Sequence, residues 1–312
     1  MFRFAVLFFF CLVSGAALAQ APAQEPPRAA PSSGPAPDAA YAAYQRGLFL
    51  TALKEATARI EKNPQDAAAM TLMGELHKQG LGVRQDHRKA ADWYRLAAGR
   101  GGLDATFALA LLTLEGRGVP RDDARARELL EDAAMRRHPA ASFNLALILL
   151  GGDDEEDHRR GAALMRVAAD AEIAEAQHAL GVLFARGRGL PRDAGEAAIW
   201  FERAARNHHA PGEVELAILL FNGEGVPVDE ARAVKLFRRA AFRGNAIAQN
   251  RLARILAAGR GANRDLVEAA AWHLAASRQG LADPWLDQAL SGITDDERAR
   301  AERLAAERVQ PL

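Results

Sequence analysis

The chain of 312 residues carries 40 basic and 40 acidic side chains, so its formal net charge is zero. This balance excludes a protein that relies on a strong basic excess to bind nucleic acid or an anionic membrane surface. Aromatic residues make up only 6% of a composition that is 49% hydrophobic, which excludes an all-β fold and favours closely packed helices.

The first 19 residues have the pattern of a secretory signal peptide. A positively charged start precedes the apolar run Phe4 to Val13, and Ala17-Leu18-Ala19 forms a small-residue cleavage site before Gln20. We therefore predict an exported protein, periplasmic if the source is Gram-negative. Cys11 is the single cysteine and would leave with this peptide, so the mature chain would have no disulfide. No other segment approaches the roughly 20 apolar residues of a membrane span.

Residues 20–38 are predicted to be a flexible linker. They contain six of the 14 prolines among alanine, serine and glycine, and such a segment buries too little apolar surface to fold. From about Ala39 the composition changes, and the sequence repeats itself at an offset of about 36 residues. A regular repeat of this length indicates an array of stacked structural units.

Four features recur in each unit. A large residue serves as the reference position in all six units: Trp93, Leu129, Leu164, Trp200, Leu236 and Trp272. Two glycines stand thirteen and eleven residues before it in five units: Gly80 and Gly82, Gly116 and Gly118, Gly187 and Gly189, Gly223 and Gly225, and Gly259 and Gly261. An aspartate stands seven residues before it: Asp86, Asp122, Asp157, Asp193, Asp229 and Asp265. A small residue, alanine or glycine, stands three residues before it.

Each of these features has a structural role. The first glycine ends a helix, because it adopts the left-handed conformation common at helix C-termini. The aspartate caps the next helix by accepting backbone N–H bonds. The small residue lets two helices approach closely, and the large reference side chain fills the space between units. Each unit is therefore predicted to be a helix, a turn and a second helix.

The pattern resembles a known repeat family. Gly80-Leu81-Gly82-Val83, Asp86, Lys89-Ala90 and Trp93 to Ala98 are similar to a Sel1-like repeat, a relative of the tetratricopeptide repeat. Six such units cover residues 66–280. The resemblance implies an all-α fold, an α-solenoid of stacked helix-turn-helix repeats that forms a right-handed superhelix.

Three regions flank or interrupt the six units. Residues 39–65, with Gly47 and Pro64, resemble a tetratricopeptide hairpin. The third unit keeps Gly151 but replaces the glycine-rich turn with the acidic run Asp153 to Asp157, for which we favour a solvated loop over a calcium site or a site for a basic partner. Residues 281–312 are predicted to cap the array with a helix over 295–308 that begins after Thr294.

The sequence offers little catalytic chemistry. It contains no G-x-S-x-G, no H-E-x-x-H and no phosphate-binding glycine loop followed by lysine, and the repeated G-x-G elements connect helices and are interpreted as turns. The pair His208-His209 falls at a predicted helix junction and lacks further ligands, which favours a polar loop over a zinc site. We predict no catalytic residue, no metal site and no cofactor.

The first helices of units two, three and five are apolar on nearly all sides, whereas a surface helix has a polar face. In the related tetratricopeptide architecture the first helix lines the concave groove. Carried over, this geometry predicts that nine side chains point away from the core: Phe107, Leu111, Leu114, Phe143, Leu147, Leu150, Val214, Ile218 and Phe221. Two interpretations remain open, burial of these residues by neighbouring helices and an apolar groove for a partner protein.

The sequence therefore predicts an exported scaffold that binds a protein partner, such as an envelope or sensor protein, on the concave face of the solenoid, without catalysis. The first alternative, implied by the resemblance, is a periplasmic regulator of a membrane sensor kinase in envelope or exopolysaccharide signalling. The second is an enzyme directed at peptidoglycan or β-lactams. A desolvated acid/base pair would favour the enzyme, and an uninterrupted apolar groove would favour the scaffold.

Overall fold

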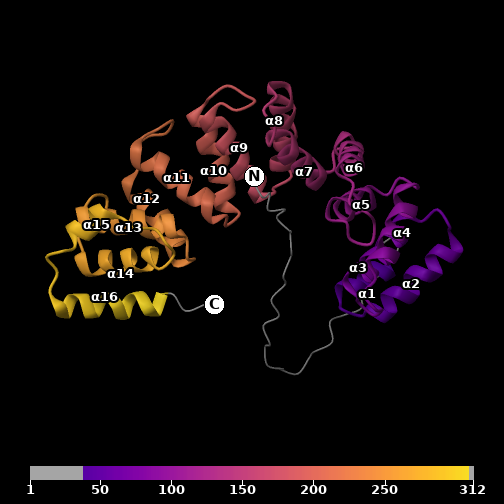
Figure 1. The fold of residues 1–312 in the computed structure, drawn as a ribbon, viewed down its shortest axis with the longest axis horizontal. Helices are drawn as coiled ribbons and strands as arrows, with labels where there is room; N and C mark the ends of the chain where they lie inside the picture. Colours follow the sequence, from indigo (N-terminus) through magenta and orange to yellow (C-terminus); the bar gives the residue numbers. More distant parts are fainter. Residues whose placement is uncertain (1–37, 309–312) are drawn as a thin grey trace, which may run out of the picture. The chain divides into compact units, whose positions relative to one another are not determined.

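The structure is a computed structural model that describes residues 38–308. Within this range the chain forms sixteen α-helices and no strand (Figure 1), which confirms the predicted all-α solenoid. No helix in these residues is long and apolar enough to cross a membrane. The predicted signal peptide and all but the last residue of the predicted linker lie outside the described residues.

Twelve of the helices form six consecutive pairs. The first helices of the pairs are α3 (Ala67–Gln79), α5 (Leu103–Glu115), α7 (Pro139–Leu150), α9 (Ala174–Arg186), α11 (Ala210–Asn222) and α13 (Ala246–Ala258). The second helices are α4 (His87–Ala98), α6 (Asp123–Met135), α8 (Glu155–Asp170), α10 (Ala194–Arg206), α12 (Glu230–Phe242) and α14 (Leu266–Ser277). From α3 to α14, each helix packs against its neighbours in this run along the chain.

The turn inside a pair is built by glycine and aspartate. Gly80 adopts a left-handed conformation with φ of 74° and donates its N–H to the Leu76 carbonyl, which ends α3. Asp86 then accepts a hydrogen bond from the backbone N–H of Lys89 at 3.0 Å, which caps α4. The same arrangement, a left-handed glycine followed by a capping aspartate, forms the turns of repeats two, four, five and six.

The second glycine of the turn serves the contact between repeats. A Cβ atom placed on Gly118 would overlap the backbone of His87, at the start of the second helix of the preceding repeat. Gly225 stands in the same relation to Ala194. Because any side chain would push the two repeats apart, glycine at this position allows neighbouring units to stack closely.

The third repeat departs from the predicted turn. Asp154, not Asp157, directly precedes α8, and its carboxylate accepts the backbone N–H of Asp157 at 2.9 Å. The assignment of Asp157 as the cap is therefore wrong, because α8 begins at Glu155 and Asp157 lies in its first turn. Much of the acidic run is helix rather than loop, where its negative charge stabilises the helix N-terminus. Gly151 has φ of −79° and is not left-handed.

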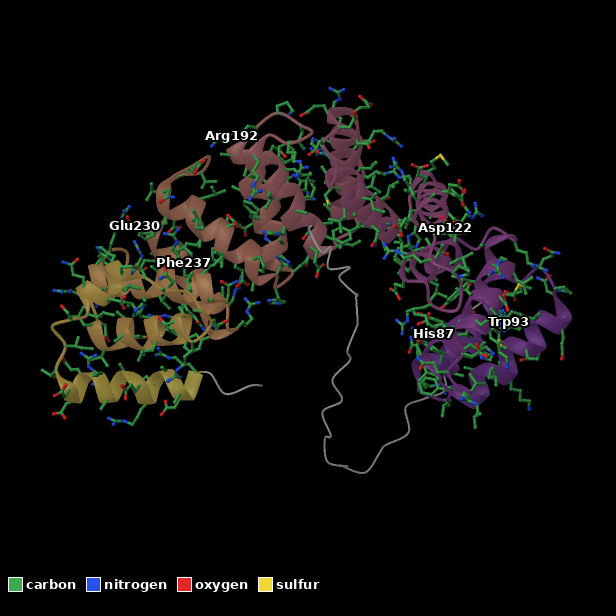
Figure 2. The ribbon with its side chains drawn as sticks, in the orientation of Figure 1. His87, Trp93, Asp122, Arg192, Glu230 and Phe237 are labelled. Carbon is green, nitrogen blue, oxygen red and sulfur yellow. The ribbon has the colours of Figure 1, made fainter. Side chains whose placement is uncertain are left out.

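The core lies between the helices of each pair and between adjacent pairs. At the predicted reference position Trp200 is 4% exposed and Trp272 is fully buried, whereas Trp93 and Leu164 are only half-buried. Figure 2 labels Phe237 on α12, which follows a reference residue and is 2% exposed. In most repeats the residue directly after the reference position is more deeply buried than the reference residue itself. These residues are Tyr94, Leu130, Met165, Phe201, Phe237 and His273.

This following position faces the first helix of its own repeat. A Cβ on Gly74 or Gly181 would overlap the ring of Tyr94 or Phe201, respectively. The first helix therefore carries its own small residue opposite the aromatic ring, and the pair closes around it.

Additional helices cover both ends of the repeats. At the N-terminal end, α1 (Ala39–Gln45) and α2 (Phe49–Lys62) form a hairpin that packs on α3. At the other end, the short helix α15 (Pro284–Ala289), which the sequence did not predict, is followed by α16 (Asp295–Arg308). The helix α16 packs on α14, and Thr294 and Glu297 exchange hydrogen bonds that cap its start.

Candidate functional site

Of the nine side chains predicted to point away from the core, eight are partly buried and one is buried. Eight of them are half-buried on α5, α7 and α11: Phe107, Leu111, Leu114, Phe143, Leu147, Leu150, Ile218 and Phe221. Val214 is the exception, since it is 4% exposed and belongs to the main core cluster. Its expected outward position is wrong because α11 is buried from Gly212 to Val214.

The half-buried residues use one side for packing and leave the other accessible. Phe143, Leu147 and Ile218 pack against the main core cluster, and the ring of Phe107 lies 4.9 Å from that of His138. Since the remaining surface of these side chains is apolar and accessible, it favours contact with another molecule over contact with water. Together these eight residues form what we call the first-helix surface.

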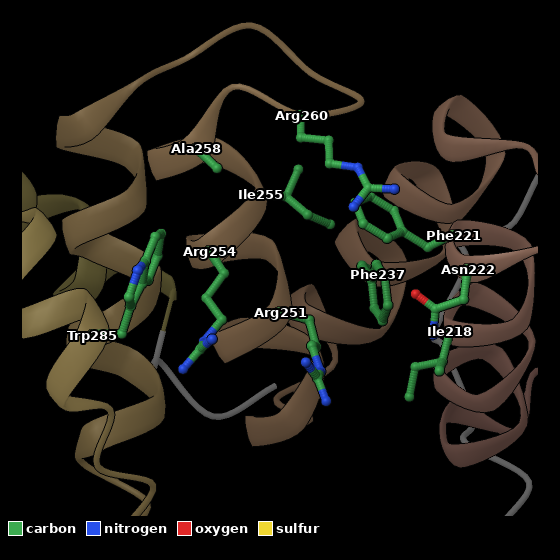
Figure 3. A pocket seen from close by; sticks show the side chains of 10 residues that line it. All are labelled: Ile218, Phe221, Asn222, Phe237, Arg251, Arg254, Ile255, Ala258, Arg260 and Trp285. Carbon is green, nitrogen blue, oxygen red and sulfur yellow. The ribbon is translucent and has the colours of Figure 1, made fainter.

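Two of these residues, Ile218 and Phe221, also line a cavity of about 240 Å³ (Figure 3). The cavity lies between repeats five and six and the segment that follows them. Its other walls come from the end of α11, α12, α13, the turn after α13, and α15: Asn222, Phe237, Arg251, Arg254, Ile255, Ala258, Arg260 and Trp285. The residues of α5 and α7 are not part of this cavity.

Two of the three guanidinium groups at the cavity are stacked on aromatic rings. The guanidinium of Arg260 lies over the Phe221 ring (Figure 3). It is 4.4 Å from the ring centre, and its Nε donates to Glu230 at 2.7 Å. Arg254 lies 5.2 Å from the centre of the Trp285 ring. Stacking and pairing hold both guanidiniums in place while leaving further N–H donors unused.

Arg254 is held by a buried carboxylate. Its Nε and Nη2 donate to the two oxygens of Asp283 at 2.6 and 2.7 Å, and Asn250 donates to the same carboxylate. Burial by itself would raise the pKa of Asp283, but the hydrogen bonds from Arg254 and Asn250 outweigh it and lower the pKa to about 2. Asp283 therefore stays ionised and fixes the orientation of Arg254 from behind the cavity wall.

Of the two histidines that raised the question of a metal site, His208 is exposed and His209 caps a helix. His209 directly precedes α11, and its Nδ1 accepts the backbone N–H of Gly212 at 3.2 Å. Its ring lies 4.9 Å from that of His178. Within residues 38–308 no three histidine, cysteine, aspartate or glutamate side chains are grouped so that they could hold a metal ion.

Burial of His178 and His209 makes the stability of the protein depend on pH. The pKa of His178 is lowered from 6.5 to about 4, mainly because the imidazole is buried and to a lesser extent because His209 is close to it. Between these values the unfolded chain binds a proton that the folded chain does not, so stability falls as the pH falls from 6.5 to 4. We expect a loss of about 1–3 kcal/mol in the free energy of unfolding, measured by denaturant titration across this range.

The control for this expectation is His178→Gln, which cannot titrate. This variant should show a smaller loss of stability between pH 6.5 and 4 than the wild type, with part of the loss remaining because burial also lowers the pKa of His209. An unchanged pH dependence in His178→Gln would show that this imidazole does not contribute.

The sequence reasoning missed the arginines and the tryptophan of the cavity. Arg251 and Arg254 are three residues apart on α13 and therefore share a helix face, which is a weak signal because exposed arginines are common. Trp285 gave a stronger signal in the sequence. It is the one tryptophan of four that does not occupy the reference position of a repeat, and it is 44% exposed.

Comparisons with known proteins agree with this architecture. One relative is chitin synthase regulatory factor 3 of Schizosaccharomyces pombe, which is 36% identical over 85 residues. That match covers 27% of this chain and only 9% of the relative.

Two solved structures share the fold. A Sel1 repeat protein from Oxalobacter formigenes superposes with a TM-score of 0.63 at 22% identity and covers 77% of this chain and 96% of its own. A protective antigen present in uropathogenic Escherichia coli strains, which displays an SLR fold, has a TM-score of 0.55 at 23% identity over 84% of this chain and 64% of its own.

The Sel1 repeat itself matches the chain six times in succession. The matched segments are residues 67–102, 103–138, 139–172, 174–209, 210–245 and 246–281. Each segment contains one pair of helices, from α3 and α4 in the first to α13 and α14 in the last. The matches cover more than half of the 312 residues, and the protein belongs to the Sel1 repeat family.

Proposed function

We propose that the protein is an exported, non-catalytic scaffold that binds a partner protein through the first-helix surface. Sel1 and tetratricopeptide-like repeat proteins are typically protein-binding scaffolds. The single observation that supports this surface as the binding site is the set of apolar side chains on α5, α7 and α11 that stay partly accessible to solvent.

The location outside the cytoplasm is part of the proposal. It is supported by the signal-peptide pattern of residues 1–19 and by the small-residue site at Ala17-Leu18-Ala19. In a Gram-negative source the scaffold would act in the periplasm, where an envelope protein or the outer domain of a sensor protein is accessible as a partner.

Photocrosslinking in whole cells tests this function. We expect a photoreactive amino acid at Leu147, half-buried on α7, to capture a defined protein in the exported fraction of the cell. The control position is Ala163, which is exposed on α8, the second helix of the same repeat. We expect no such product at Ala163, because that side of the repeat carries no first-helix surface.

Two results would contradict the proposal. Equal capture at Leu147 and Ala163 would show that the crosslinks reflect collision rather than a binding surface. Recovery of the intact chain, with Met1 still at its N-terminus, in the cytoplasm would contradict export.

A further inference from the structure

The cavity between α11 and α13 combines an apolar interior with a basic rim. Phe221, Phe237 and Ile255 form apolar walls, and Trp285 stands at the side with 44% of its surface exposed. The volume of about 240 Å³ suits one large side chain rather than a whole small domain. An occupant must therefore present an apolar group that enters the cavity and polar groups that meet the rim.

All charged residues in the lining are arginines. Arg251, Arg254 and Arg260 contribute guanidiniums, and no aspartate or glutamate lines the cavity. The carboxylates that pair with Arg254 and Arg260, those of Asp283 and Glu230, lie outside the lining. The surface offered to an occupant is thus positive, and it is complementary to negative charge.

The three guanidiniums retain hydrogen-bond donors. Arg254 uses two of its N–H groups on Asp283, and Arg260 uses one on Glu230. Arg251 is exposed and, within residues 38–308, its guanidinium makes no hydrogen bond. An arginine has five N–H donors, which match the two oxygens of a carboxylate. Since Arg254 and Arg260 are already oriented, they lose little freedom when a carboxylate binds.

We infer that this cavity binds an acidic segment of the partner protein in which an apolar side chain lies beside carboxylates. The inference rests on the proposed function and adds the chemistry of the segment recognised. The apolar side chain enters between Phe221 and Ile255, and the carboxylates meet Arg251 and Arg260 at the rim. The cavity continues the first-helix surface, because Ile218 and Phe221 belong to both.

The charge of the protein favours a peptide over a nucleic acid. Nucleic-acid binding relies on many cations along an extended surface, whereas this chain has a net charge of zero. At the rim, Asp283 and Glu230 already offset part of the positive charge of Arg254 and Arg260. The remaining positive charge is enough to bind the few carboxylates of an acidic peptide.

Fluorescence anisotropy with defined peptides tests this inference. The probe is a fluorescein-labelled peptide with one leucine between two pairs of glutamates. Matched probes carry glutamine or lysine in place of glutamate, or glycine in place of leucine. We expect the glutamate probe to bind at least about tenfold more tightly than the glutamine probe and its affinity to fall as salt is added. The lysine probe should not bind, and the glycine probe should bind more weakly.

Two arginine variants identify the site. We expect Arg251→Gln and Arg260→Gln each to weaken binding of the glutamate probe about tenfold, because each removes a charge-assisted contact. The control is Arg84→Gln, an exposed arginine in the turn of the first repeat, which should bind as the wild type does. Circular dichroism melts of all three variants check that the fold is retained.

Several outcomes would overturn the inference. These are equal binding of the glutamate and glutamine probes, an effect of Arg251→Gln and Arg260→Gln no larger than that of Arg84→Gln, and tighter binding of inorganic phosphate or a single-stranded oligonucleotide. Crosslinking at Leu147 on α7 tests the proposed function independently of this inference, because Leu147 does not line the cavity.

Discussion

Replacing Trp200 with alanine is expected to lower the free energy of unfolding by about 3–5 kcal/mol, the usual cost of removing a large buried aromatic side chain. Trp200 is 4% exposed and lies in the main core cluster between repeats. The guanidinium of Arg203 stacks over it at 4.5 Å, and its Nε1 donates to Glu196 at 3.3 Å. Alanine would leave a cavity and remove both contacts.

The neighbouring residue provides a matched control. Ile199 is 52% exposed on the same turn of α10, so Ile199→Ala should change stability by about 0.5 kcal/mol or less. Denaturant unfolding of the two variants, followed by circular dichroism, measures both losses. Similar losses in Trp200→Ala and Ile199→Ala would mean that the reference position does not carry the packing between repeats.

The repeat architecture was predictable because its turns depend on local chemistry. A glycine such as Gly116 is needed where φ is positive, and an aspartate such as Asp122 is favoured directly before a helix, so both leave a signal in the sequence. The third repeat misled the same reasoning. There the glycine turn is missing, α8 begins earlier, and the register of the other repeats assigned the cap to Asp157 instead of Asp154.

The candidate site was only partly predictable. Ile218 and Phe221 were found because they break the polar pattern of a surface helix, whereas Val214 was misplaced because periodicity does not show which turn of a helix is covered. Arg254 and Trp285 were missed because they meet only in the folded chain, across 31 positions of sequence. This contact depends on how the last repeat packs against α15, and the repeat motif carries no information about that packing.

Replacing Phe143 with alanine is expected to weaken partner binding by 2 kcal/mol or more, about thirtyfold in affinity. Phe143 is half-buried on α7 and belongs to the first-helix surface. A large aromatic side chain that becomes fully desolvated on binding is a typical hot spot. In the isolated protein the same change should cost about 1–2 kcal/mol of stability, less than at a fully buried position, because part of the ring is already exposed to water.

The most direct test measures both losses in the same purified variant. Phe143→Ala is compared with wild type for its melting temperature and for its affinity toward the partner captured at Leu147, with Trp200→Ala as the control for a core residue. We expect Phe143→Ala to melt close to wild type and bind about thirtyfold more weakly, while Trp200→Ala melts much earlier. If Phe143→Ala melts as early as Trp200→Ala, or binds the partner as tightly as wild type, the first-helix surface is not the binding site.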